Sequence, residues 1–250
     1  MTRALAVERL GRVPYAEALA LQERLVAERR AGRGPDRLLL LEHPPVVTLG
    51  RSARRASLLA SPEELARRGI ELHEVSRGGD ATYHGPGQLV GYLIADLEAR
   101  GEPDVHRYLR RLEAVLGAAL RRLGIAPRAL AGMTGVFVDD PRQQDPPRKL
   151  ASIGVGLRGW VTWHGVALNA TLDPAEFGVI VPCGLRNVAM TSVRRELGAA
   201  SPADLWERAL DELETAFRDA FGRSDERPAA ACAPAPDAAG APRSGRGLSL

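Results

Sequence analysis

Helical and strand patterns of apolar residues alternate along the chain from about residue 5 to residue 222. Apolar residues at helical spacing predict a helix from Pro14, at its first turn, to the break at 32–34, and another over about 105–123. The start signals Ser61-Pro62-Glu63-Glu64 and Ser201-Pro202-Ala203-Asp204 predict two more helices.

Short apolar, β-branched runs predict strands at 37–42, 46–49, 89–94, 135–138, 150–155 and 161–169. Strands therefore outnumber helices, and several pairs are joined by short links that permit antiparallel pairing. The pattern favours a mixed-sheet α/β or α+β domain over a regular doubly wound fold.

Composition changes at residue 223, where the chain becomes rich in Ala, Pro, Gly, Ser and Arg. We expect a single domain over 1–222 and a disordered tail over 223–250 that leaves Cys232 without a role. Two cysteines do not make a disulfide framework, and no apolar run is long enough for a signal peptide or a membrane span. The sequence predicts a soluble protein of a reducing cytoplasm, with no membrane partner.

The net charge is only +3, because 34 basic residues face 31 acidic ones. The arginines mostly stand among glutamates, as on solvated helix faces, so we do not expect nucleic acid as a partner. The histidines and cysteines lack metal-ligand spacing, and no metal site is predicted. His164, in a strand-like segment, is expected to be a satisfied and partly buried histidine.

The segment 77–88 carries four glycines among twelve residues, between two predicted strands. Glycines at this density let backbone N–H groups approach a bound group closely. The segment matches neither the phosphate loop nor the dinucleotide fingerprint, so it gives no support to nucleotide binding. Arg77, Tyr83 and His84 favour a binding loop over an ordinary connection.

Lys149 is the only lysine in the chain. All the other residues in the total of 34 Lys and Arg are arginines. A lysine amine can give up its proton and act as a base, whereas a guanidinium stays protonated. Cys183, between Pro182 and Gly184, lies at a bend where its thiol is well placed to face a pocket. The plainer alternatives are a lysine left by an arginine-biased genome and a cysteine that serves as a small core residue.

The two residues could work as a pair. Lowering a thiol pKa from about 8.5 to about 6.5 takes roughly 2.7 kcal/mol of preferential thiolate stabilisation. An ammonium about 4 Å away supplies roughly 4 kcal/mol at an effective dielectric near 20, but only about 1 kcal/mol in bulk water. A Cys–Lys pair therefore works only in a sheltered pocket.

Four motifs in this order resemble the lipoyl(octanoyl) transferases, and the similarity spans about residues 5–222. Residues 43–51 resemble the same family's upstream strand segment. The motifs are Arg77-Gly78-Gly79-x-x-Thr82-Tyr83-His84-Gly85-Pro86-Gly87-Gln88, Lys149-x-Ala151-Ser152-Ile153-Gly154, His164-Gly165-x-Ala167-Leu168-Asn169 and Pro182-Cys183-Gly184-Leu185.

The resemblance implies the fold of the biotin and lipoate protein ligases, a larger mixed sheet and a smaller sheet flanked by helices. It also implies a reaction in which octanoyl passes from the phosphopantetheine of acyl carrier protein to an enzyme cysteine. The octanoyl group then passes to a lysine of a lipoyl domain, the first step of endogenous lipoate assembly. The acceptors would be the E2 subunits of 2-oxoacid dehydrogenases and the glycine cleavage H protein. No cofactor is implied beyond the carrier-bound donor.

Carried onto this sequence, the resemblance makes Cys183 the acyl-thioester nucleophile and Lys149 the residue that lowers its pKa and then moves the proton. The implied acyl-binding residues are Arg77, Gly78, Gly79, Asp80, Ala81, Thr82, Tyr83, His84, Ser152, Ile153, Gly154, Gly165, Val166 and Ala167. An ATP-dependent lipoate or biotin ligase of the same fold is the main alternative, but such enzymes need no cysteine. A non-catalytic relative and an arginine-rich nucleic-acid-binding protein are the others.

Overall fold

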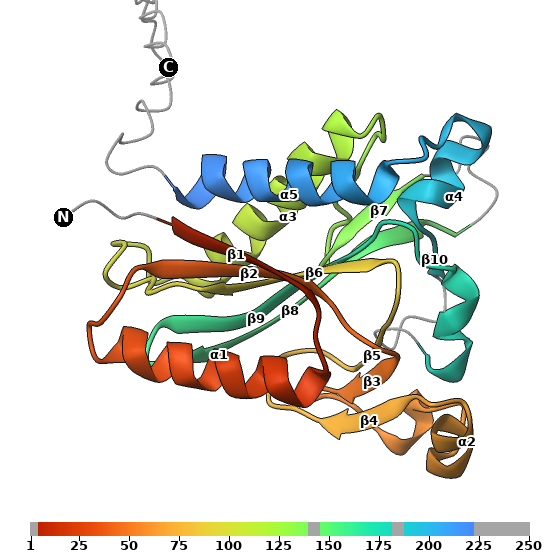
Figure 1. Cartoon of the computed structure of the whole chain (residues 1–250), viewed down its shortest axis with the longest axis horizontal. Coiled ribbons are helices and arrows are strands. Elements are labelled where there is room, and N and C mark those ends of the chain that lie inside the picture. Colours follow the sequence, from red (N-terminus) through yellow and green to blue (C-terminus); the bar gives the residue numbers. More distant parts are fainter. Residues whose placement is uncertain (1–4, 140–145, 182–187, 223–250) are drawn as a thin grey trace, which may run out of the picture.

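The computed structural model describes residues 5–139, 146–181 and 188–222. Two β-sheets form its framework, and helices cover both faces of the larger one (Figure 1). The sheets are mixed, with parallel and antiparallel neighbours in each. The predicted fold class is confirmed. The predicted tail at 223–250, Cys232 and Cys183 lie outside the described residues.

The larger sheet has seven strands in the order β1-β2-β6-β9-β8-β10, and β7 also pairs with β8. Within it, β1 and β2 run parallel, as do β8 and β10, while β6, β8 and β9 pair antiparallel. The strands are β1 (Leu5–Arg12), β2 (Asp36–Glu42), β6 (Gln88–Ile94), β7 (Val136–Val138), β8 (Arg148–Arg158), β9 (Val161–Asn169) and β10 (Ala189–Met190).

The smaller sheet has three strands in the order β4-β3-β5. Its strands are β3 (Val46–Leu49), β4 (Glu71–Glu74) and β5 (Ala81–His84). β5 lies within segment 77–88, for which the sequence predicts a glycine-rich loop between two strands. Pairing of Ala81–His84 with β3 makes that part of the connection a strand, which period-2 patterning could not show because residues 81–84 are all buried.

Helices cover both faces of the larger sheet because its central strands are apolar on both sides. In β2, Leu38 and Leu40 face the core beneath α3 and α5, whereas Leu39 and Leu41 face the core beneath α1. The helices are α1 (Tyr15–Arg30), α2 (Pro62–Arg67), α3 (Val105–Arg122), α4 (Val193–Leu197) and α5 (Leu205–Phe221), with short 3-10 helices η1 (Arg55–Ser57), η2 (Pro174–Val179) and η4 (Gly198–Ala200).

The predicted helix starts and strand runs agree with the structure at most positions. Ser61 caps α2 by accepting from the Glu64 N–H, as its sequence signature predicts. β1 and β4 were missed because their side chains are mixed in character and largely half-buried or exposed. In the described part of the chain, no helix is long and apolar enough to cross a membrane.

Candidate active site

A cavity of about 250 Å³ lies between the two sheets, where loop 77–80 and β5 approach β8 and β9. Gly78 N donates to Val155 O over 2.9 Å, which ties the loop to β8. The wall consists of Tyr15, Arg77, Gly78, Gly79, Asp80, Ala81, Thr82, His84, Tyr92, Gly132, Met133, Thr134, Lys149, Ser152, Ile153, Gly154, His164, Gly165, Val166 and Ala167.

Three sequence segments that are far apart in the chain therefore meet at one cavity. Residues 77–82 and His84, residues 152–154 and residues 165–167 all line it, together with Lys149. Register explains part of this convergence, because Gly154 in β8 pairs with Gly165 in β9. The structure thus brings together the implied acyl-binding residues, with one exception.

The exception is Tyr83, whose side chain points to the opposite face of β5. Neighbouring residues of a strand face opposite ways, so Thr82 and His84 line the cavity while Tyr83 does not. The Tyr83 ring packs edge-on against Phe177 with 5.8 Å between centroids, and its hydroxyl donates to Glu176 over 3.4 Å. The placement of Tyr83 in the pocket is therefore corrected.

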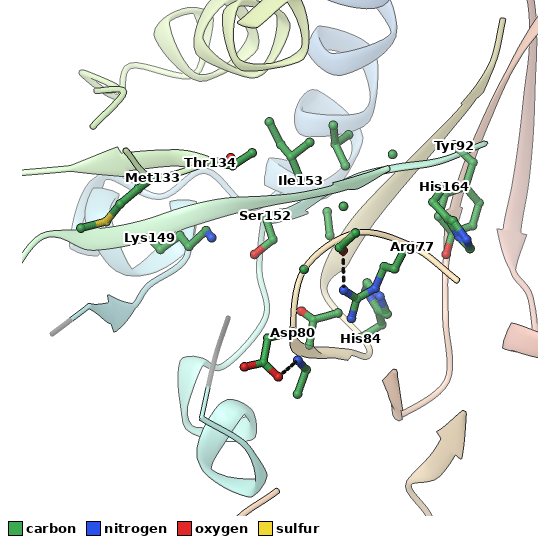
Figure 2. Close-up of a pocket in the computed structure, with 18 of the residues that line it drawn as sticks. Arg77, Asp80, His84, Tyr92, Met133, Thr134, Lys149, Ser152, Ile153 and His164 are labelled. Atoms are coloured by element: carbon green, nitrogen blue, oxygen red, sulfur yellow. Dashed lines mark hydrogen bonds between the residues drawn. The ribbon is translucent and has the colours of Figure 1, made fainter. Parts of the chain in front are cut away.

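Lys149 lies on β8 between β7 and β10, and it is only 2% exposed. Its backbone carbonyl accepts from Thr191 N over 3.0 Å, which holds the strand that follows the 182–187 segment against it. The Lys149 Nζ atom lies 5.4 Å from the centre of the Phe137 ring, a cation–π contact. The amine is thus sheltered from solvent at one end of the cavity (Figure 2).

Cys183 lies outside the described residues, so the structure gives no position for its thiol. The residues on either side of segment 182–187 are described. Val181 N donates to Ser57 O over 2.9 Å, and Met190 pairs in register with Lys149. The chain therefore returns to the strand of Lys149 within seven residues of Cys183.

The Arg77 side chain is buried in the cavity wall and connects loop 77–80 to β3 through hydrogen bonds. Its guanidinium donates to the Thr48 carbonyl over 2.8 Å, to the Thr48 hydroxyl over 2.9 Å and to the Gly78 carbonyl over 3.1 Å. These bonds fix loop 77–80 against β3. Gly50 is required beside the loop, because a Cβ there would lie 2.3 Å from Gly79 O.

Buried tyrosine and histidine rings close the other end of the cavity. Figure 2 shows Tyr92 and His164 at this end, far from Lys149. His84 Nδ1 donates to Gln88 Oε1 over 2.6 Å, because the Gln88 amide nitrogen donates to Asn169 over 2.9 Å. The Tyr92 hydroxyl donates to Nε2 of His43 over 2.8 Å. Nδ1 of His43 in turn donates to Val13 O over 2.7 Å.

The histidine and tyrosine rings at this end are uncharged at neutral pH. Burial, with the neighbouring His43, lowers the pKa of His84 to about 3, and burial lowers the pKa of His164 to about 3 as well. Burial raises the pKa of Tyr15 to about 12. An apolar group entering the cavity would meet neutral rings there.

His164 differs from its sequence expectation. The residue adopts φ 55°, and its backbone N–H donates to Gln22 Oε1 over 2.8 Å. Its buried Nε2 has no hydrogen-bond partner among the described residues, so it is not the satisfied histidine that was expected. Its neighbour Gly165 must lack a side chain, since a Cβ would lie 2.1 Å from Gly91 O.

Several wall residues had no signal in the sequence, namely Tyr15, Tyr92, Gly132, Met133 and Thr134. Tyr15 is the first residue of α1 and looks like part of an ordinary amphipathic helix. Within the described ranges no group of three or more His, Cys, Asp or Glu side chains could hold a metal ion.

The fold is shared with solved lipoate protein ligases. A bipartite lipoate protein ligase from Thermoplasma acidophilum aligns with a TM-score of 0.62 at 17% identity, covering 89% of this chain and 86% of that one. Lipoate-protein ligase A bound with ATP aligns with a TM-score of 0.61 at 17% identity, covering 90% and 89%. Identities this low show the fold alone.

Sequence relatives define the class more narrowly. The octanoyltransferase of Rubrobacter xylanophilus is 49% identical over 222 residues, covering 88% of this chain and 95% of the relative. That of Geobacter sulfurreducens is 51% identical over 191 residues, covering 76% and 75%. That of Myxococcus xanthus is 45% identical over 217 residues, which is 87% of this chain but 58% of the longer relative.

Fold, cavity and relatives together define an acyltransferase. The match to the lipoyl protein ligase A/B catalytic domain spans residues 14–214. The chain belongs to this family and, within it, to the lipoyl(octanoyl) transferases.

Proposed function

We propose that this protein moves an octanoyl group from octanoyl-acyl carrier protein to the target lysine of a lipoyl domain, through a thioester on Cys183. One observation carries the proposal: a buried lysine lies on the wall of a cavity that glycine-rich segments line and that neutral rings close at the far end. The names of its relatives, octanoyltransferases at 45–51% identity, support the acyl group chosen.

The acyl chain would lie along β8 and β9, between Lys149 and the rings at the closed end. His164 pairs with Val155, six residues beyond Lys149 on β8, which corresponds to about 20 Å of strand at about 3.3 Å per residue. An octanoyl chain built from C–C bonds of about 1.5 Å extends about 9 Å. The remaining length is enough for the thioester and the lysine side chain.

Lys149 would activate Cys183. A lone ammonium about 4 Å from a thiol supplies roughly 4 kcal/mol toward the thiolate at an effective dielectric near 20, against about 1 kcal/mol in water. The burial of Lys149 provides the shelter that this pairing requires. A shift of two pKa units costs roughly 2.7 kcal/mol, so one buried ammonium is sufficient.

The proton would cycle through the same amine. The Cys183 thiolate attacks the thioester carbonyl of the donor, and the departing phosphopantetheine thiolate takes a proton from Lys149. Neutral Lys149 then accepts a proton from the acceptor's ε-ammonium, and the freed amine attacks the Cys183 thioester. Amide formation expels the Cys183 thiolate beside a lysine that is charged again, and the second proton of the attacking nitrogen is released to solvent.

The donor thioester makes ATP unnecessary, because thioester exchange is nearly isoenergetic and amide formation runs downhill. No cofactor is then needed beyond the carrier-bound octanoyl. The acceptors would be lipoyl domains of 2-oxoacid dehydrogenase E2 subunits and the glycine cleavage H protein, in the cytoplasm, where thiols stay reduced. We assign the catalytic unit to residues 1–222, around the family match at 14–214.

A transfer assay with two donors separates this function from that of a ligase. Octanoyl-acyl carrier protein should modify a lipoyl domain without ATP, and free octanoate with ATP should not. Modification that requires free acid and ATP would instead indicate an ATP-dependent ligase, the activity suggested by the solved structure with bound ATP.

A further inference from the structure

A basic surface lies beside the cavity, formed by Arg51, Arg54, Arg55 and Leu59. All four residues are exposed. Leu59 is 62% exposed and Trp160 is 36% exposed, and these two are the large apolar side chains that stand out from the surface in the described part of the chain. The basic surface thus combines three guanidinium groups with an uncovered leucine within nine residues.

Its arginines differ from most others in their charge environment. Arg9 pairs with Asp211 over 2.8 Å, and Arg148 pairs with Glu196 over 2.9 Å. Arg51, Arg54 and Arg55 form no ion pair with any carboxylate of the described residues. No carboxylate of the described residues neutralises their charge, and a negatively charged partner could use it.

The basic surface borders the open end of the cavity. Arg51 N donates to Arg77 O, and Ser52 N donates to Gly79 O, each over 3.1 Å. Gly79 is exposed and lines the cavity, whereas the rings at the closed end, such as Tyr15 and His164, are each 2% exposed. A group entering the cavity passes this edge.

The other edge of the basic surface contacts the segment that precedes residue 182. Leu59 N donates to Val179 O, and Val181 N donates to Ser57 O, each over 2.9 Å. The basic surface thus spans the distance between the pocket loop at 77–80 and Val181.

We infer that the basic surface binds the protein that carries the acyl donor. The inference rests on the proposed function, in which the acyl group arrives on a phosphopantetheine arm. Arginine pairs well with a phosphodiester and with surface carboxylates, and both come with an acidic carrier. The acceptor instead presents a lysine cation at its reacting centre, which the positive charge of three arginines would repel.

Single-turnover charging tests this assignment. The variant Arg51→Gln/Arg54→Gln/Arg55→Gln removes the three charges, and Arg24→Gln/Arg33→Gln/Arg208→Gln removes three exposed arginines elsewhere as a control with the same change in net charge. Each protein is mixed at low salt with octanoyl-acyl carrier protein or with octanoyl-pantetheine, which lacks both phosphate and protein. Intact mass follows octanoyl appearing on the enzyme.

We expect the surface variant to be charged by the carrier at least about tenfold more slowly than the parent, with the difference shrinking as salt rises. Charging by octanoyl-pantetheine should be unchanged, and the control variant should match the parent with both donors. Parental charging of the surface variant by the carrier would overturn the inference while leaving the proposed function in place.

Discharge separates the two protein partners. Enzyme already charged from octanoyl-pantetheine is mixed with a lipoyl domain, and parental rates in the surface variant are expected. A loss confined to this second step would assign the surface to the acceptor and overturn the inference. If neither donor charges even the parent, the proposed function fails and the inference fails with it.

Discussion

An alanine Cβ at Gly135 would lie 2.7 Å from Cε and 3.2 Å from Nζ of Lys149. The same atom would lie 2.6 Å from Ala151 O, and Gly135 adopts φ +127°, a conformation that residues with side chains rarely adopt. Gly135 N donates to Glu113 Oε1 over 3.2 Å, which holds this backbone in place. Gly135 therefore provides the space that the buried lysine occupies.

Gly135→Ala should impair transfer by displacing the Lys149 amine. We expect a loss of about 10- to 100-fold in transfer rate, the scale of a misplacement of about 1 Å in an active site. Gly34→Ala is the matched control, since Gly34 also has a positive φ, +70°, but has nothing within 4 Å of its added Cβ. Equal activity in the two variants, measured on a lipoyl domain, would argue against this role.

Lys149→Arg should keep a cation on the wall but lose most transfer activity. A guanidinium cannot cycle a proton at neutral pH, and general acid–base catalysis contributes about 100-fold or more. Steady-state transfer rates with octanoyl-acyl carrier protein measure the effect. Transfer at the parental rate would mean that the lysine acts only through its charge.

Tyr15→Ala should shift the preferred acyl length upward, because the ring closes the end of the cavity far from Lys149. Competition between octanoyl and longer acyl carriers measures the shift. Tyr83→Ala is the control, since both rings are buried, at 2% and 1% exposure, but Tyr83 lies behind β5. The control should lose stability without a change in length preference. The same outcome in Tyr15→Ala would refute the role of Tyr15.

The buried histidines predict a stability that falls in acid. The pKa of His43 is lowered by burial to about 4, and those of His84 and His164 to about 3, against 6.5 for an ordinary histidine. Between these values the unfolded chain binds more protons, so folding is favoured above about pH 6.5 and weakened as pH falls toward 3–4.

Each histidine should contribute up to about 1.4 kcal/mol per pH unit to that slope. Denaturant unfolding between pH 7 and pH 4.5 measures the slope, and His164→Gln should flatten it. His106, exposed on α3, supplies the control His106→Gln, which should leave the slope unchanged. A slope that His164→Gln does not alter would show that His164 is not held neutral.

Much of the fold could be predicted because its elements have strong local patterns. The helix at Val105–Arg122 and the strand at Gln88–Ile94 follow directly from apolar spacing. The strand β5 could not be recognised among glycines, because its pairing with β3 depends on residues about 35 positions away. The register between strands that lie far apart in the chain is determined by tertiary packing, so local sequence patterns do not reveal it.

The residues of the cavity wall likewise include some that the sequence predicts and some that it does not. Glycine density drew attention to residues 77–84, and the single lysine drew attention to Lys149. The structure brings Lys149 and this segment, apart from Tyr83, to one cavity. Tyr15 and Tyr92 carry no sequence signal, because an aromatic residue in a helix or strand is usually core. Whether the Tyr83 side chain points into the cavity depends on which face of β5 is turned toward it. The pairing of β5 with β3 in the smaller sheet determines that face.

The intact mass of the protein after incubation with octanoyl-acyl carrier protein tests the central claim most directly. The parent should gain the mass of one octanoyl group, located at Cys183 by peptide mapping and lost on adding a lipoyl domain, and Cys183→Ala should gain nothing. An unchanged parental mass during active transfer, or an octanoyl adduct that persists in Cys183→Ala, would contradict the thioester mechanism.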